Sequence, residues 1–425
     1  MEKFNPIFDK MTQQTMISSH PYFLKIGYLG FFLFLTGITF SIVVLQAAAV
    51  LFLILGVGVL SDKWTRRRFT AFDWLLIFYL FSGVLSIILS PAPSESLTGI
   101  IRHGILFALI PIHHLIVRMK RFSLTTVIFL LVVGGTLAAA MGGYHHWRGV
   151  ERTAGFYGGY YTLATLLTLT IPLTVVFSFL QKKIWRIIMP GAAGIQLVAL
   201  WWTYTRSAFL GLIIAFMSVA GLIFWQKKNI PILSRLKTVG LLLIIPLVLA
   251  TLILTSLDPR INPFAPVKST GGHPADITSG RGSIVQDAVV LLKKQVQDSR
   301  WDRILLGHGL RSRVILSDSP FRSWESDYLE VFMNQGLLGL GLVLAIYFLF
   351  LKRIVLLLKP EILNSQSLVP GVVISAGAFW VMSFFTLQLQ GISSAAIFVV
   401  LFTMADALPE QKKQEYFSVQ GSFTN

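Results

Sequence analysis

The chain has 425 residues, of which 54% are hydrophobic and only 13% are charged. A soluble protein of this length would need more polar surface, so the composition indicates a membrane protein. Apolar runs of roughly 20 residues recur, each long enough to cross the bilayer as a helix. These runs are continuous rather than alternating, which excludes a transmembrane barrel. There is no cysteine, and therefore no disulfide or thiolate site.

In chain order, the apolar runs predict an all-α polytopic membrane protein with about twelve transmembrane helices. We expect an N-terminal tail (1–25), nine helices within 26–256, a long polar loop (257–324), three helices within 325–407 and a C-terminal tail (408–425). The first helix is expected to be retained, because no small-residue cleavage site follows it. The expected spans are 26–45, 46–60, 71–90, 98–117, 123–142, 158–180, 187–204, 207–225, 238–256, 328–351, 367–387 and 391–407.

The basic residues predict the orientation of this bundle. The net charge of +17 is distributed in short clusters between apolar runs, which is typical of topology signals rather than of nucleic-acid binding. These clusters fall on the side of the two termini, so both termini are expected in the cytoplasm. The loop 257–324 then lies outside, although it holds ten Lys and Arg against six Asp. An anionic ligand at the outer face would explain this excess.

The outer loop is expected to contain an amphipathic helix at 278–298. Ile284, Ala288, Leu292 and Val296 recur there at four-residue spacing, which places them on one helical face. We expect this face to lie on the outer surface of the bundle.

Several arginines occupy the outer face, which the positive-inside rule predicts to be depleted of them. Arg152, Arg206 and Arg281 each stand where a loop meets a helix, and Arg102 lies about one turn inside the outer end of the fourth helix. Snorkelling at the interface would explain a single arginine. Several together favour binding of an anionic headgroup such as a lipid-linked diphosphate, because guanidinium groups grip phosphate oxygens in a bidentate fork.

Three carboxylates, Glu325, Asp327 and Glu330, stand at the start of the tenth predicted helix. Helix capping explains one of them, and Asp327 fits that role. A carboxylate beside a partly dry cavity can instead act as a general base. His308 is a second candidate base, close in sequence to Arg311.

The sequence predicts no metal site, nucleotide site or cofactor. No HExxH motif and no Walker-type loop occur in the chain, and we find no paired-histidine spacing typical of a metal site on the outer side. The spacing of Glu325 and Asp327 is weak evidence for a bound cation.

Four ordered motifs between about 150 and 345 resemble the O-antigen ligase and O-antigen polymerase family of bacterial envelope glycosyltransferases. ERTAGFYGGYYTLATLLTLTIPL is similar to the family's Arg-Thr-Gly-x-Phe segment, and TYTRSAFLGL to its Thr-x-Ser-Arg helix junction. SGRGSIVQDAVVLL followed by RILLGHGLRS resembles its arginine, helix and Gly-x-Gly elements. ESDYLEVFMNQGLLGLGLVL is similar to its His-Asn-x-Tyr-Leu…Gly-Leu-Leu-Gly-Leu element.

The resemblance implies a metal-independent, inverting, GT-C-like glycosyltransferase of the bacterial inner membrane. It implies transfer of a glycan from undecaprenyl diphosphate at the periplasmic face to a lipid A–core, polysaccharide or protein acceptor. Arg206 and Arg281 match the family's diphosphate-binding arginines, and Arg152 is added to them as a third candidate. The position of the family's catalytic histidine is occupied by Glu325.

That departure leaves three activities of this family open: O-antigen ligase, polysaccharide polymerase and protein O-oligosaccharyltransferase. Twelve helices would also suit a secondary transporter, a different class. Transporters tend to have related halves and ionisable sites near mid-membrane, whereas these charges gather at one surface.

Overall fold

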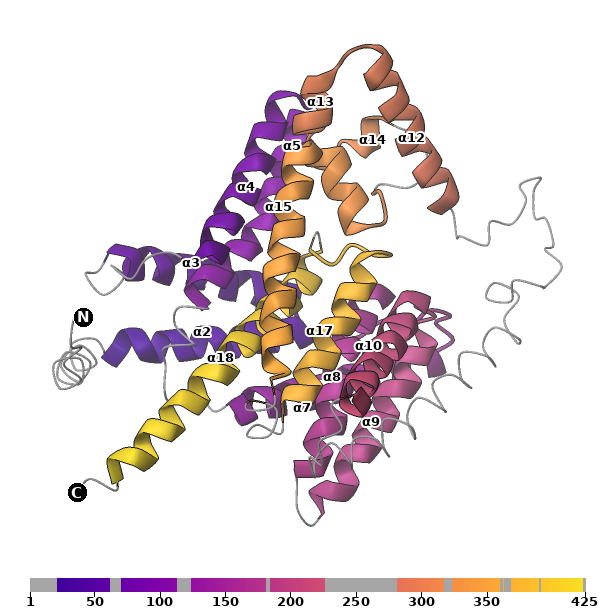
Figure 1. The fold of residues 1–425 in the computed structure, drawn as a ribbon. Helices are drawn as coiled ribbons and strands as arrows, with labels where there is room; N and C mark the ends of the chain where they lie inside the picture. The colour runs from indigo at the N-terminus through magenta and orange to yellow at the C-terminus, as the bar shows by residue number, and fades with distance from the viewer. Residues whose placement is uncertain are drawn as a thin grey trace.

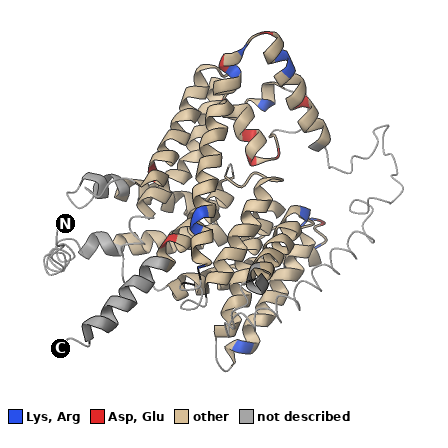
Figure 2. Ribbon diagram, viewed as in Figure 1, with Lys and Arg blue, Asp and Glu red and all other residues tan. Residues whose placement is uncertain are grey.

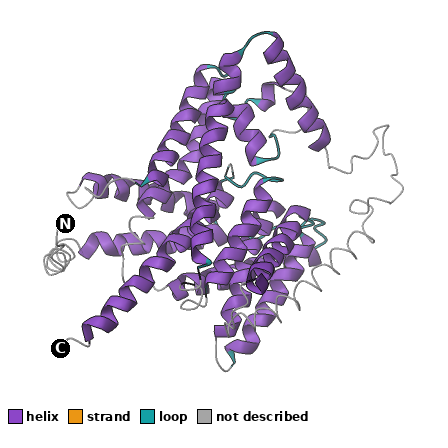
Figure 3. Ribbon diagram, viewed as in Figure 1, coloured by secondary structure: helices purple, strands orange, loops and turns teal. Residues whose placement is uncertain are grey.

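The computed structural model describes residues 21–61, 70–112, 124–180, 184–225, 281–316, 323–359, 362, 368–389 and 391–422. Within these ranges the regular elements are helices and there is no strand (Figures 1 and 3). The predicted ninth helix and the loop up to residue 280 lie outside the described residues, as do residues 1–20 of the N-terminal tail.

The helices follow one another in the order shown by the colours of Figure 1. They are α2 (Pro21–Phe40), α3 (Ile42–Ser61), α4 (Ala71–Ile88), α5 (Pro93–His103), the 3-10 helix η2 (Gly104–Ala108), α7 (Leu124–Trp147), α8 (Tyr160–Leu180), α9 (Trp185–Trp202), α10 (Arg206–Trp225), α12 (Arg281–Gln297), α13 (Trp301–Leu306), α14 (Arg313–Leu316), α15 (Asp327–Leu357), α17 (Val369–Ser383) and α18 (Ile392–Ser422).

Several of these helices have the length and composition of membrane spans. Five spans among the described residues qualify fully: Ala71–Ile88, Pro93–Ile112, Leu124–Trp147, Tyr160–Leu180 and Asp327–Leu357. Shorter apolar helices accompany them, including Ile26–Phe40, Ile42–Leu55 and Ile392–Leu408. The prediction of an all-helical, multi-pass membrane protein is therefore confirmed, and the number twelve stays a prediction.

The bundle is centred on α8, which packs against α7, α9, α10, α17 and α18. Its side chains are buried on nearly all sides, as expected for a helix that is apolar all round. Polar side chains join the helices where they do occur. The Gln196 amide of α9 donates to Thr136 of α7 at 2.9 Å and to Thr174 of α8 at 3.1 Å, the type of bond that holds helices together in lipid.

Several predicted helices differ from the observed ones. The first two, predicted to meet between residues 45 and 46, meet at residue 41, because α2 ends at Phe40 and α3 begins at Ile42. The predicted helix 98–117 is broken, because α5 ends at His103 and the chain continues as a 3-10 turn. The predicted helix 328–351 begins at Asp327 and leaves helical geometry at Gly336, where φ is 67° and ψ is −164°. We call 327–335 the short arm of α15 and 337–357 its long arm. The chain reverses direction between them in Figure 1.

The expected amphipathic helix is confirmed as α12, with a different buried face. Ile284 and Ala288 are buried as predicted, but Val296 is 51% exposed and Gln295 is buried in its place. The reason is a polar partner, described below, which holds the Gln295 amide inside. In Figure 1, α12 to α14 stand at one end of the bundle beside α4, α5 and α15.

Charged residues avoid the long bundle helices. In Figure 2 these helices are mainly tan, while coloured residues gather near helix ends and in the region of α12 to α14. This distribution follows from the cost of placing ionised groups in lipid.

Candidate active site

The segment 307–313 is fastened to the first turn of α5. Ser96 donates through its hydroxyl to the Leu310 carbonyl at 2.9 Å. The guanidinium of Arg311, the arginine close in sequence to His308, forms an ion pair with Glu95 at 2.8 Å. The segment 307–313 and the start of α5 therefore lie together at one end of the bundle.

Two glycine-containing segments cross at close range in this region. The backbone N–H of His308 donates to the Met333 carbonyl at 3.0 Å, and that of Gly309 donates to the Asn334 carbonyl at 2.9 Å. Gly307 and Gly336 both have positive φ. A Cβ on Gly307 would overlap the Asn334 backbone, and one on Gly336 would overlap the Leu305 backbone. We call this contact between 305–309 and 333–336 the glycine crossing; only glycine allows the two backbones to approach this closely.

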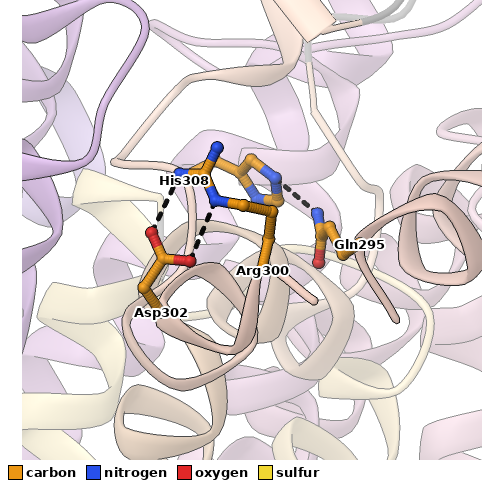
Figure 4. Close-up of polar contacts among 4 residues, drawn as sticks. All are labelled: Gln295, Arg300, Asp302 and His308. Carbon is orange, nitrogen blue, oxygen red and sulfur yellow. Dashed lines mark hydrogen bonds and ion pairs between the residues drawn. The ribbon is translucent and has the colours of Figure 1, made fainter. Parts of the chain in front are cut away.

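His308 is buried at this crossing, and both of its ring nitrogens have partners. Nδ1 lies 3.0 Å from the Met333 carbonyl oxygen, and Nε2 lies 2.6 Å from the Gln295 amide nitrogen (Figure 4). A carbonyl can only accept, so Nδ1 carries the proton and Nε2 accepts from Gln295. Burial lowers the pKa of His308, which favours this neutral form. The imidazole thus joins α12 to the short arm of α15.

Glu325 stands on a strained turn that leads into the short arm. Its φ of 58° lies in the left-handed region, which is uncommon for a residue with a side chain. The side chain is half-buried, and its Oε1 accepts a hydrogen bond from the Ser323 hydroxyl at 3.0 Å. Such outliers persist where the surroundings hold them, and they cluster at functional sites.

The residues on both sides of Glu325 are firmly held. On one side, the Trp324 backbone N–H donates to the Glu330 carboxylate at 2.6 Å. The second oxygen of Glu330 accepts from the Asn334 amide at 2.7 Å. Glu330 is therefore buried within protein and satisfied by donors, which explains why a carboxylate can persist beside a membrane span.

On the other side, Asp327 is completely buried. Its carboxylate accepts from the Leu389 backbone N–H at 2.9 and 3.0 Å and from the Tyr347 hydroxyl at 3.0 Å. The sequence predicts a helix cap at Asp327, but its carboxylate accepts hydrogen bonds from residues 20 and 62 positions away. Asp327 thus ties the short arm to the long arm and to the loop before α18, a role that no local pattern in the sequence reveals.

Sequence reasoning also missed Arg313, whose side chain is fully buried. Its guanidinium donates to the Ser323 carbonyl at 2.9 Å and to Asp287 of α12 at 3.1 Å. It also lies over the Trp324 ring at 4.4 Å. The sequence contains the arginine, but nothing local identifies partners 10 and 26 residues away.

Two of the predicted arginines, Arg152 and Arg206, lie on neighbouring segments of the bundle. The Thr153 backbone N–H donates to the Trp202 carbonyl at 3.1 Å, so the loop that carries Arg152 lies against the junction that leads to Arg206. Arg152 is exposed and stacks on Tyr160 at 4.0 Å. Tyr160 is also within electrostatic range of Glu325. Arg206 is exposed at the first position of α10.

Arg281 is the first residue of α12, and Arg102 lies in α5, but their side chains are outside the described residues. The direct relation of these two guanidinium groups to Glu325 therefore stays a prediction. In the described part of the chain, no three His, Asp or Glu side chains come together in a way that could hold a metal ion.

The site and the helical bundle together define a multi-pass membrane protein with a polar cluster at one end. Residues 191–344 match the O-antigen ligase family (Wzy_C). This match to residues 191–344 confirms the resemblance noted in the sequence and supports ligase-like glycan transfer in surface polysaccharide biosynthesis. The match includes Arg206, α12, the glycine crossing and Glu325, whereas Arg152 precedes it. No curated protein matches the chain.

Proposed function

We propose that the protein transfers a glycan from undecaprenyl diphosphate to an acceptor hydroxyl at the periplasmic face of the bacterial inner membrane. The observation that carries the proposal is Glu325. It occupies the position of the family's catalytic histidine, on a strained turn whose neighbours are held by Glu330 and Asp327. A base that is held in one position loses little entropy when it reacts.

In this reaction the Glu325 carboxylate accepts the proton of the acceptor hydroxyl. The acceptor oxygen forms a bond to the anomeric carbon of the donor sugar, and the bond from that carbon to the phosphate oxygen breaks. Undecaprenyl diphosphate leaves with the electron pair. Arg206 and Arg281, with Arg152, stabilise the negative charge that develops on it. Attack from the side opposite the leaving group inverts the anomeric configuration.

Glu325 is the better candidate for the base than His308. The acceptor nitrogen of His308 is already bonded to Gln295, and its ring is buried. A general base must reach the proton that it abstracts. Half-buried Glu325 meets that requirement, whereas His308 would first have to release α12.

The test is glycan transfer by purified Glu325→Gln protein, with the lipid-linked glycan as donor. Loss of the base is expected to reduce kcat by about 10²–10⁴-fold without a change in thermal unfolding. Asp302→Asn is the matched control, because Asp302 is a solvent-exposed carboxylate paired with Arg300 in the same outer segment. Full transfer by Glu325→Gln would refute the assignment of the base.

The acceptor is identified by the glycans of a deletion strain. Lipid-linked polymer that accumulates without attachment indicates an O-antigen ligase, and a single repeat unit left on the lipid indicates a polymerase. Unchanged lipopolysaccharide with a lost glycoprotein indicates protein glycosylation. Ligase activity is the leading expectation, because residues 191–344 match that family. Transport across vesicles with no change to the glycan would instead indicate a transporter.

A further inference from the structure

Arg313 is a buried cation that the proposed chemistry does not use. Its side chain has no exposed surface, which is rare for arginine unless the charge is paired. Burying a guanidinium carries a large desolvation cost, which good geometry and several hydrogen bonds must offset. The partners of Arg313 therefore show what this position does.

Those partners belong to two separate parts of the outer region. Asp287 lies on α12, six positions after Arg281, which begins that helix. Ser323 and Trp324 lie on the turn that carries Glu325, and the guanidinium contacts the carbonyl of the first and the ring of the second. The Arg313 guanidinium thus links α12, whose first residue Arg281 is a candidate for diphosphate binding, to the turn that carries Glu325.

The turn depends on this link because Glu325 has an unfavourable backbone conformation. A residue with a side chain at φ 58° costs on the order of 1–3 kcal/mol and relaxes unless the surrounding structure opposes it. After Glu325, Asp327 holds the chain through Leu389. Before Glu325, Arg313 fixes the Ser323 carbonyl, and Glu330 fixes the Trp324 N–H.

We propose that Arg313 is a positioning residue, which holds the Glu325 turn against α12 so that the base and the diphosphate site keep a fixed separation. This proposal rests on the proposed function, because it concerns the placement of that base. Arg313 does not touch substrate in it. Lysine cannot replace it, because a single ammonium lacks the planar fork that reaches Asp287, Ser323 and the Trp324 ring together.

The first test is hydrogen exchange of Arg313→Lys, measured by mass spectrometry on the full-length protein in detergent. We expect faster exchange at 323–327 and unchanged exchange in the bundle helices α7 to α9. Arg300→Lys is the matched control, because Arg300 forms an exposed pair with Asp302 in the same region (Figure 4) and exposed pairs contribute little. Unchanged exchange at 323–327 in Arg313→Lys would overturn the proposal without bearing on the function of Glu325.

The second test is kinetic. A displacement of about 1 Å at a reacting group can cost on the order of 10²-fold in rate, so Arg313→Lys is expected to lower kcat by about 10- to 100-fold. The KM for the lipid-linked donor is expected to stay within about two-fold. In a Glu325→Gln background the same substitution is expected to cause no further loss, because residues that act as a unit are non-additive.

An additive loss in the double variant would refute a role through Glu325. If the Arg313→Lys protein does not accumulate, the exchange test can be made with Asp287→Asn instead. This substitution leaves Arg313 and its bond to the Ser323 carbonyl in place and weakens only the link to α12. Faster exchange at 323–327 in this variant supports the proposal, and unchanged exchange there overturns it. Full transfer by Glu325→Gln alone would refute the assignment of the base, while the exchange experiment would still decide whether Arg313 holds the turn.

Discussion

Substituting Gly336 by alanine perturbs the glycine crossing at its tightest point. At φ 67° and ψ −164°, Gly336 occupies a region that is nearly restricted to glycine, where another residue costs on the order of 1–3 kcal/mol. The new Cβ would also overlap the carbonyl carbon and oxygen of Leu305. Because these are backbone atoms, no change of rotamer relieves the overlap.

The two segments must therefore separate, which weakens the bonds from His308 N–H and Gly309 N–H to the short arm. Each such bond contributes about 1 kcal/mol. Together with the backbone conformation, the expected loss is about 3–5 kcal/mol of unfolding free energy. Thermal unfolding in detergent measures it.

Gly341 supplies the matched control in the same helix. It is exposed on the long arm, and a Cβ there would meet nothing within 4 Å. Gly341→Ala is expected to be neutral or to stabilise by up to about 1 kcal/mol, because alanine favours a helix more than glycine does. Equal unfolding temperatures for Gly336→Ala and Gly341→Ala would refute the reasoning about the crossing.

Two further predictions concern buried polar groups of the same region. Asp327→Ala should reduce the unfolding free energy by about 3–5 kcal/mol, because the Leu389 N–H and the Tyr347 hydroxyl lose their acceptor. Tyr347→Phe should reduce the unfolding free energy by less than Asp327→Ala does, and it should cause no further reduction in the Asp327→Ala background. An equal reduction in both backgrounds would contradict the hydrogen bond between Tyr347 and Asp327. Burial lowers the pKa of His308, so the unfolded chain binds its proton more readily than the folded chain. The contribution of neutral His308 to the unfolding free energy is therefore present above the ordinary histidine pKa of about 6.5. It is lost as the pH falls below that value, by at most about 1.4 kcal/mol per pH unit. His308→Ala should remove this pH dependence of the unfolding free energy, measured from pH 5 to 7.

The sequence predicts the helical class because hydrophobic runs of this length have few alternatives in a membrane. It also locates α12 from its four-residue spacing. It does not predict the break at Gly336, since the run from Leu337 onward is apolar and the glycine there looks like one more packing position. The break depends on the approach of Leu305, which no local pattern contains.

The candidate site was predictable in part for a similar reason. Glu325 and the outer arginines were identified from their positions relative to helices and from the family motifs. The same reasoning grouped Asp327 and Glu330 with Glu325, although the structure gives each of them a different set of partners. The sequence does not reveal the role of Arg313, because that role comes from burial, and the burial of Arg313 depends on contacts with α12 and the Glu325 turn.

The bond between Asp327 and the Leu389 N–H also has a consequence for biosynthesis. Leu389 follows Asp327 by 62 positions and lies between α17 and α18. Since a chain is synthesised from its N-terminus, the Glu325 turn gains this anchor only after α17 has been made and the loop before α18 has emerged. A chain truncated before Leu389 lacks the donor altogether. The polar cluster around Glu325 is thus completed late, when most of the helices of the bundle have been made.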